Sequence, residues 1–205
     1  MRTLYAETNF LVGYAAGQRA KFDVILQAAS TPEARIRVPE VCVMEALVAI
    51  DRKIAESKRF ATDIGSRLRD LRISVSSTSA TTAAKTLEQA RVDLATFDDD
   101  VLARRDHALT FLAAHGAFFS FDAAWFRDAA RRGLIAAQRD SLILSAVLRD
   151  AALLGGDALF ITENKLDFDT PSVRGALLAT GVKWTDDAGI ALAFMQGHRR
   201  WSELP

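Results

Sequence analysis

The chain contains a single cysteine, Cys42, which excludes an intrachain disulfide and is typical of a reducing compartment. Cys42 stands between two valines, so we expect a buried apolar residue and not a nucleophile. Long apolar runs are also missing, because the longest uncharged stretch, about 108–121, is shorter than the ~20 residues that cross a bilayer. The apolar N-terminal stretch is interrupted by Glu7 and Asn9, which argues against a signal peptide. We therefore expect a soluble, cytoplasmic protein with no membrane partner.

The net charge of the chain is zero, because its 26 Lys and Arg residues balance its 26 Asp and Glu residues. The overall charge therefore neither favours nor excludes nucleic acid, and only local clusters of charge can do so. No glycine-rich loop ends in Gly-Lys-Ser/Thr, which excludes a P-loop nucleotide site. The three histidines have no Cys or Glu at metal-ligand spacing, so a zinc site is not expected.

Short apolar runs that predict strands alternate along the chain with amphipathic runs that predict helices. This alternation predicts an α/β fold with a central parallel sheet flanked by helices. The predicted strands cover 4–6, 35–38, 158–162 and 182–184. The predicted helices cover 10–16, 19–29, 39–72, 83–114, 122–132, 140–154, 171–180 and 186–198.

The predicted helices between about 51 and 133 form an enlarged helical insertion. No Gly/Pro-rich boundary flanks this insertion, so we expect it to belong to one domain of residues 1–205. The Ser/Thr-rich stretch 73–82 is predicted as a loop, and 116–121 as an apolar break. The stretch 83–114 is either one long helix or two in succession, interrupted at the acidic run 98–100.

Four carboxylates stand at strand ends, at helix starts or on an apolar helix face. Glu7 ends the first strand, and Asp140 precedes an apolar helix. Asp167 lies in the loop after the strand 158–162. Each has an ordinary alternative: Asp140 could cap its helix, Asp167 or Asp169 could cap the next one, and Glu7 could be solvated.

Glu45 is harder to explain in this ordinary way, because its neighbours along the predicted helix are apolar. An ionised acid on such a face is costly unless a cation or a hydrogen-bond donor meets it, which leaves a salt bridge or a metal. Four acids that meet at one edge of a parallel sheet would repel each other unless Mg²⁺ or Mn²⁺ neutralised them. Such ions activate water and clamp the oxygens of a phosphodiester during hydrolysis.

Four passages, in this order, give the chain a resemblance to the PIN-domain nucleases. They are YAETNFLV (5–12), VPEVCVMEAL (38–47), RDSLILSAVL (139–148) and FITENKLDF (160–168). The resemblance implies a PIN-like fold, with a parallel sheet between helices, and a Mg²⁺- or Mn²⁺-dependent endoribonuclease. Many PIN proteins are toxins neutralised by an antitoxin, and dimers are common. The resemblance thus adds an antitoxin-like protein inhibitor and a homodimer to RNA as expected partners.

The resemblance also assigns roles to single residues. Metal-binding and catalytic acids would be Glu7, Glu45, Asp140 and Asp167. Polar residues that orient the first acid and the metal-bound water would be Asn9 and Thr162, with Asn164 beside them.

Basic residues near these acids are candidates for binding RNA phosphates, which position a strand without selecting its sequence. They are Arg52, Lys53, Lys58 and Arg59 downstream of Glu45, Arg139 beside Asp140, and Arg131 and Arg132. The alternative is a solvated helix face on which Asp51 and Glu56 partner these charges.

One residue departs from the family pattern, because the first acid is typically Asp and here is Glu7. The additional methylene moves the carboxylate by more than about an ångström, and catalysis can be sensitive to such misplacement. The alternative function is therefore a catalytically weak, PIN-like module that binds RNA or protein.

Overall fold

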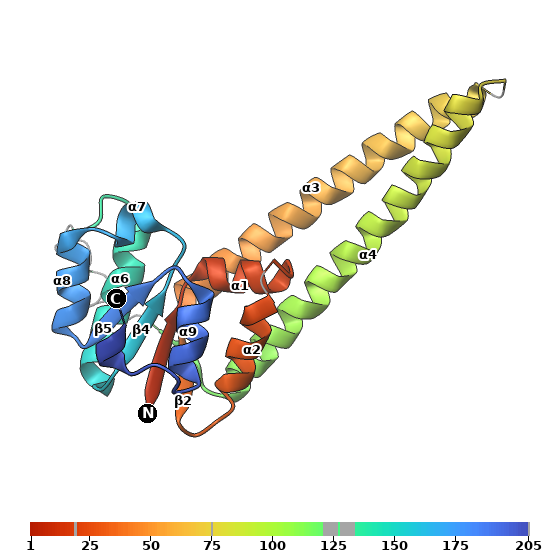
Figure 1. The fold of residues 1–205 in the computed structure, drawn as a ribbon. Coiled ribbons are helices and arrows are strands. Elements are labelled where there is room, and N and C mark those ends of the chain that lie inside the picture. Colours follow the sequence, from red (N-terminus) through yellow and green to blue (C-terminus); the bar gives the residue numbers. More distant parts are fainter. Residues whose placement is uncertain (19, 75, 121–126, 128–133, 205) are drawn as a thin grey trace.

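The structure is a computed structural model that describes residues 1–18, 20–74, 76–120, 127 and 134–204. The predicted α/β fold is confirmed within this part of the chain: a parallel sheet is flanked by helices and carries a helical insertion (Figure 1). The helix predicted over 122–132, with Arg131 and Arg132, lies almost wholly outside the described residues. No helix of the described residues is long and apolar enough to cross a membrane.

The sheet contains five parallel strands among the described residues, in the order β3-β2-β1-β4-β5. They are β1 (Arg2–Ala6), β2 (Ala34–Pro39), β3 (Phe118–Phe119), β4 (Ala158–Ile161) and β5 (Val182–Thr185). The central strands β1 and β4 are buried on both faces, as their continuous apolar runs predict. Connections from β1 to β2 and from β2 to β3 step one way across the sheet, and the connection from β4 to β5 steps the other way.

Helices cover both faces of the sheet (Figure 1). On one face lie α1 (Thr8–Ala15), α2 (Ala20–Ala28) and α9 (Ala188–Met195); on the other lie α6 (Gln138–Leu154) and α8 (Pro171–Ala179). The two shortest helical elements of the described residues are the single-turn α7 (Lys165–Phe168) and the 3₁₀ helix η1 (Trp201–Glu203). Cys42 is fully buried, as predicted, and burial raises the pKa of its thiol to about 12.

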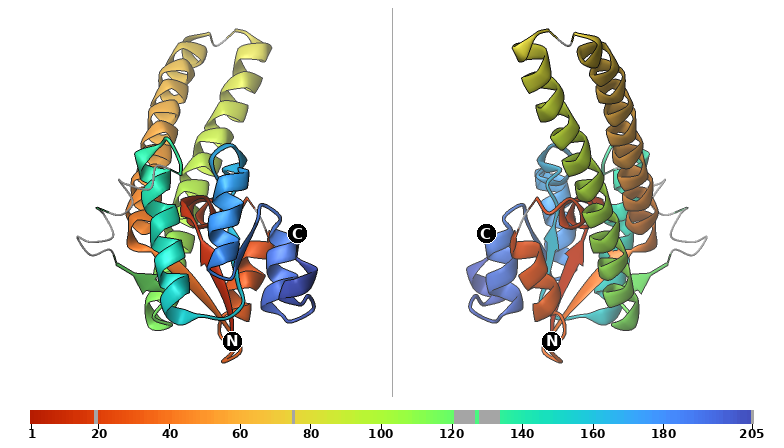
Figure 2. Two further views of the ribbon diagram at one scale, coloured as in Figure 1. Left: turned by 90° about the vertical axis from the view of Figure 1, so that its left-hand side faces the viewer. Right: turned by 90° about the vertical axis from the view of Figure 1, so that its right-hand side faces the viewer.

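The insertion is a hairpin of two long helices, α3 (Glu40–Ile73) and α4 (Thr78–Ala114), which projects far beyond the sheet (Figures 1 and 2). Its base is joined to the body by a small apolar cluster of Ala15, Ile50, Ile54 and Val101. Further out, Ile64 and Leu68 of α3 are buried against α4, at the spacing of four that keeps side chains on one helix face. The hairpin is therefore packed against α1 at its base and against itself further out.

Two local predictions were wrong or incomplete, and of the two alternatives for 83–114 the single long helix is confirmed. The loop predicted over 73–82 is only the short connection between α3 and α4, because Ser77 caps α4 by accepting a hydrogen bond from the Ala80 N–H (3.2 Å). The stretch through the acidic run 98–100 is one continuous helix, which contains no Gly or Pro to interrupt it. The apolar break predicted over 116–121 contains the two-residue strand β3, which pairs with Val38 and Pro39.

A buried ionic network ties α6 to the sheet. Asp150 of α6 is 5% exposed and accepts hydrogen bonds from the Tyr5 hydroxyl (2.9 Å) and from the Arg37 Nε (3.0 Å). Arg37 also donates to the Gly116 carbonyl (3.1 Å), and its guanidinium lies 4.7 Å from the centre of the Phe119 ring. One carboxylate therefore connects α6, β1 and β2, while Arg37 extends the connection to the residues around β3.

We predict that Asp150→Ala destabilises the protein by about 3 kcal/mol or more, because it leaves the Arg37 guanidinium partly buried without its counter-charge. The matched variant Tyr5→Phe removes one hydrogen bond but leaves the ion pair, so it should cost only about 1 kcal/mol. Urea unfolding of the three proteins at pH 7 measures both values. Equal losses for the two variants would contradict the central role of the ion pair.

Candidate functional site

The candidate site lies at the carboxyl end of β1 and β4, between which the strand connections reverse direction. Glu7 follows β1 directly, and Thr162 follows β4. In open α/β sheets the helices on the two sides of such a reversal diverge and leave a crevice at this edge. The strand order therefore places these two residues side by side at the mouth of a crevice.

Glu7 is a buried carboxylate held by neutral donors. It is 5% exposed, and its Oε2 accepts hydrogen bonds from the Thr162 hydroxyl and, at 3.5 Å, from the Asn9 Nδ2. No cation lies within ion-pair distance of Glu7 among the described residues. Asn9 and Thr162 therefore both contact the first acid.

Asn164 joins the two acids that come from the second half of the chain. Its Nδ2 donates to the Asp167 Oδ2 (2.8 Å) and lies 3.3 Å from the Asp140 Oδ2. Asp140 lies in the first turn of α6 and is 4% exposed, and Asp167 lies in α7. The short helix α7 thus brings Asp167 to Asp140 through one shared amide.

Glu45, on α3, is bound by both a hydroxyl and an arginine. The Thr8 hydroxyl donates to the Glu45 Oε2 (2.7 Å), and the Arg139 Nε lies 3.1 Å from the Glu45 Oε1. The same Arg139 Nε is 3.9 Å from the Asp140 Oδ1, so the guanidinium bridges α3 and α6. Of the two explanations for Glu45, the salt bridge is therefore present.

A cavity of about 640 Å³ opens between α1, α3 and α6, and three of the four acids line it: Glu7, Glu45 and Asp140. Basic residues Arg52, Lys53 and Arg139 lie on its wall, together with Asn9 and Asn164. Met44 and Val48 are 63% and 68% exposed on the same wall and give it an apolar stripe. The cavity thus combines negative charge at its base with positive and apolar groups around it.

The electrostatics of the site follow from burial and from like charge. Burial raises the pKa of Glu7 to about 7, and the negative charges of Asp140 and Glu45 add to the rise, while the Thr162 hydrogen bond and the Arg139 charge oppose it. Burial likewise raises the pKa of Asp140, although Arg139 partly offsets the effect. Carboxylates crowded in this way favour a cation among them.

The donor set fits a hard divalent cation in chemistry, because it consists of carboxylate, hydroxyl and amide oxygens. The distances between the acids do not fit a metal ion. Within the described residues, no group of three or more His, Cys, Asp or Glu side chains is arranged so that it could hold one. Binding an ion would therefore require the acids to move closer together. Arg139, which lies between Glu45 and Asp140, is 68% exposed on its side chain.

The ordinary alternatives for the acids do not hold. Asp140 is not the helix cap, because α6 begins after Ala137, and α8 is capped by the Thr170 hydroxyl and not by Asp167 or Asp169. Glu7 is buried and not solvated.

Two other placements differ from or extend the sequence predictions. Lys58 and Arg59 do not line the cavity, because they lie further out on the hairpin. The sequence patterns did not single out Thr8 as a site residue, although it directly follows Glu7 at the start of α1 and could have been found by that position.

Comparisons with protein-family models, curated proteins and solved structures found no match to this chain.

The raised pKa of Glu7 predicts a pH-dependent stability. The unfolded chain ionises this acid near pH 4.5 and the folded chain only near pH 7, so its contribution to stability is fully present at low pH and falls between these values. Glu7→Gln cannot ionise, so in EDTA it should exceed the wild type in stability at pH 8 by on the order of 2–3 kcal/mol.

Urea unfolding at pH 4.5 and pH 8 measures this difference, which should shrink towards the lower pH. The exposed acid Glu56 provides the control, because Glu56→Gln should leave the pH dependence unchanged. A Glu7→Gln variant that is less stable than the wild type at pH 8 would contradict the burial cost.

Proposed function

We propose that the protein is a metal-dependent endoribonuclease that hydrolyses RNA phosphodiesters, with a PIN-like arrangement of its acids. The observation that carries the proposal is the shared cavity: Glu7, Glu45 and Asp140 come from three distant parts of the chain and line one crevice at the reversal point of the sheet. Asp167 joins them through Asn164. Burying acids together without a cation is unfavourable, so their assembly favours a site that works with one.

Within this proposal the acids Glu7, Glu45, Asp140 and Asp167 would hold Mg²⁺ or Mn²⁺. A bound ion of this type supplies a Lewis acid for the scissile phosphodiester and lowers the pKa of water to generate a nucleophile. Thr162 and Asn9 fix the orientation of the Glu7 carboxylate, and Asn164 fixes that of Asp167. The buried side of each carboxylate is thereby occupied by a neutral donor, which leaves its other lone pairs available.

The cationic wall supports RNA as the substrate. Arg52 and Lys53 follow Glu45 by about two turns of α3, at roughly 10–12 Å along the helix axis. They would hold phosphates that flank the cleaved bond, and an arginine can do so with two hydrogen bonds. Arg139 would move from the acids to a phosphate when RNA enters, and Arg59 would contact the strand further along α3.

We predict that purified protein cleaves single-stranded RNA in Mg²⁺ or Mn²⁺ and loses this activity in EDTA. Asp140→Asn and Glu45→Gln should each reduce the rate by more than ~100-fold, because removing a metal ligand exceeds the 10–100-fold effect of its outer partners. Gel assays with a labelled RNA measure the rates, and Asp63→Asn, at an exposed position further along α3, should cleave like the wild type. Cleavage that survives both acid variants, or survives chelation, would rule out this proposal.

A second candidate function is a catalytically weak module that binds RNA or protein. The observation that favours it is the bridge made by Arg139, whose guanidinium already supplies a positive charge to Glu45 and Asp140. The longer side chain of Glu7, in place of Asp, points in the same direction.

We predict that Arg139→Ala tightens the binding of Mn²⁺, measured by calorimetry, by about tenfold or more, because it removes a competing cation from the acids. Glu7→Asp tests the other feature. If the wild type binds RNA without cutting it and Glu7→Asp cuts it, the module is the function of the natural chain. If no variant binds Mn²⁺ or cuts RNA, both the nuclease and the weakened nuclease are excluded.

Three further predictions rest on the family resemblance alone. They are a toxin role, an antitoxin-like inhibitor and a homodimer. Co-expression with a protein inhibitor would test the first two, and sedimentation would test the third.

A further inference from the structure

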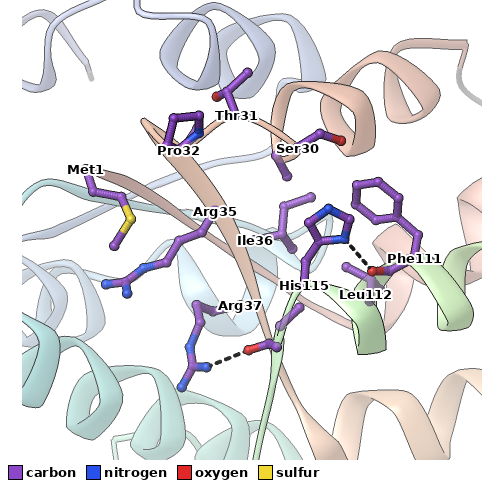
Figure 3. Close-up of a pocket in the computed structure, with 14 residues that line it drawn as sticks. Met1, Ser30, Thr31, Pro32, Arg35, Ile36, Arg37, Phe111, Leu112 and His115 are labelled. Carbon is purple, nitrogen blue, oxygen red and sulfur yellow. Dashed lines mark hydrogen bonds between the residues drawn. The ribbon is translucent and has the colours of Figure 1, made fainter.

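The outer half of the α3–α4 hairpin holds two large aromatic side chains that are exposed. Phe60 of α3 is 57% exposed and Phe97 of α4 is 50% exposed. Phe111, nearer the base of α4, shows the contrast, because its ring stacks on His115 with the ring centres 4.1 Å apart (Figure 3). Within the described part of the chain, no ring pair or cation–π contact includes Phe60 or Phe97. Both rings are therefore open to a partner from outside.

The two rings lie on the same face of the hairpin. Phe97 directly precedes Asp98, which is 8% exposed. Phe60 directly precedes Ala61, which lies seven residues after the buried Ile54 and therefore on the same side of α3. Each ring thus stands one position before the line of contact between the helices. Because α3 and α4 run in opposite directions, equivalent positions turn to the same face of the pair.

The two rings also lie at similar heights along the hairpin. Ile54 and Val101 belong to one apolar cluster near its base. Phe60 follows Ile54 by six residues and Phe97 precedes Val101 by four residues, so both lie further out. At a rise of about 1.5 Å per residue, the distances outwards are about 9 Å and about 6 Å. Phe60 and Phe97 therefore form one exposed aromatic platform across the two helices.

The platform lies on the face of the hairpin that leads to the acid-lined cavity. Lys53, seven residues before Phe60, lies on the wall of that cavity. Arg104, seven residues after Phe97, is 3.7 Å from Asp23 of α2. The platform thus continues the face that packs against the body of the protein, at about 10 Å beyond the cavity wall, because seven residues span about 10 Å of helix.

Cations accompany the platform along α3. Arg59 directly precedes Phe60 and follows Arg52 by seven residues, so a second row of side chains leads from the cavity wall. Arg52 is 3.7 Å from Glu56, but no ion pair of the described residues includes Lys53 or Arg59. Proteins that bind single-stranded nucleic acid combine cations along the backbone with aromatic rings on which bases stack. This combination favours an RNA strand over an apolar protein surface.

We propose that Phe60 and Phe97 stack the bases of a single-stranded RNA whose backbone runs from the acid-lined cavity along α3. The inference rests on the proposed nuclease function for the choice of RNA, and it adds the part of the substrate that lies beyond the scissile bond. Lys53 and Arg59 bind the phosphates on this path. Every base has a flat face, so the platform binds strands of any sequence.

The length of the helix sets the distance of the platform from the cut. Phe60 follows Glu45 by fifteen residues, or about 22 Å of α3. A stacked strand rises about 3.4 Å per nucleotide, so the platform lies at most about seven nucleotides from the scissile bond. A strand of sixteen nucleotides therefore reaches both.

The test compares two labelled strands of sixteen residues by fluorescence polarisation, an oligouridylate and a matched ribose-phosphate strand without bases. EDTA is present so that cleavage does not interfere. We expect the wild type to bind the oligouridylate at least about tenfold more tightly than the abasic strand, because only the first can stack. Phe60→Leu and Phe97→Leu keep apolar side chains but remove the rings. Each should weaken binding of the oligouridylate at least about threefold and leave binding of the abasic strand unchanged.

Two further variants provide the controls. Phe60→Trp keeps a larger ring, so it should bind the oligouridylate at least as tightly as the wild type. Ile73→Ala removes another exposed apolar side chain, which is 79% exposed at the outer end of α3, and should change neither affinity. Circular dichroism checks that the variants fold. If a leucine variant does not fold, Phe60→Trp and the two strands with the wild type decide the question.

Leucine variants that bind the oligouridylate like the wild type would overturn the platform, and so would equal losses on the two strands. Those results leave the nuclease proposal intact, because cleavage is measured separately with the acid variants. Ring-dependent binding by a chain that never cuts RNA would reject the nuclease and retain the platform. If the leucine variants dissociate a dimer in sedimentation and bind RNA unchanged, the rings contact a second copy and the inference fails.

Discussion

The burial of Glu7 beside other acids is the constraint on which the rest of this site depends. A carboxylate that is 5% exposed and has Asp140 and Glu45 as neighbours is unfavourable in its charged form. Neutral donors, Thr162 and Asn9, bind Glu7 on its buried side, and the exposed cation Arg139 lies near Glu45 and Asp140. The site is therefore arranged to favour a positive group in its cavity, whether a guanidinium or a metal.

The two long helices serve this arrangement at their base. Glu45 lies on the first turns of α3, where the helix is held against α1 and where Thr8 donates to its carboxylate. The apolar cluster of Ile50, Ile54 and Val101 holds α3 and α4 together just beyond this point. The hairpin thus carries an acid into the crevice at one end and extends a charged surface away from it at the other.

Two cavities lie beside the sheet, and their linings differ in charge. Its carboxyl edge, at the reversal between β1 and β4, has acids in a crevice with cations around them. A second cavity, beside β2 and the end of α4, is lined by Arg35, Arg37 and His115 and by no Asp or Glu of the described residues. The buried contacts of Asp150 with Arg37 and Tyr5 hold β2 against α6 and β1.

The sequence by itself determined the elements whose signals are local. Apolar runs and helical periodicity predicted β1, β2, β4 and β5 and the main helices, because these depend on neighbours along the chain. The same patterns singled out Glu7, Glu45 and Asp140, since each is an acid in an apolar or strand-end setting. Only the tertiary structure decided that these three line one cavity, because they are far apart in sequence and meet through the order of the strands. The two-residue β3 and the Arg139 bridge likewise depend on residues brought together by folding, and no local pattern marks them.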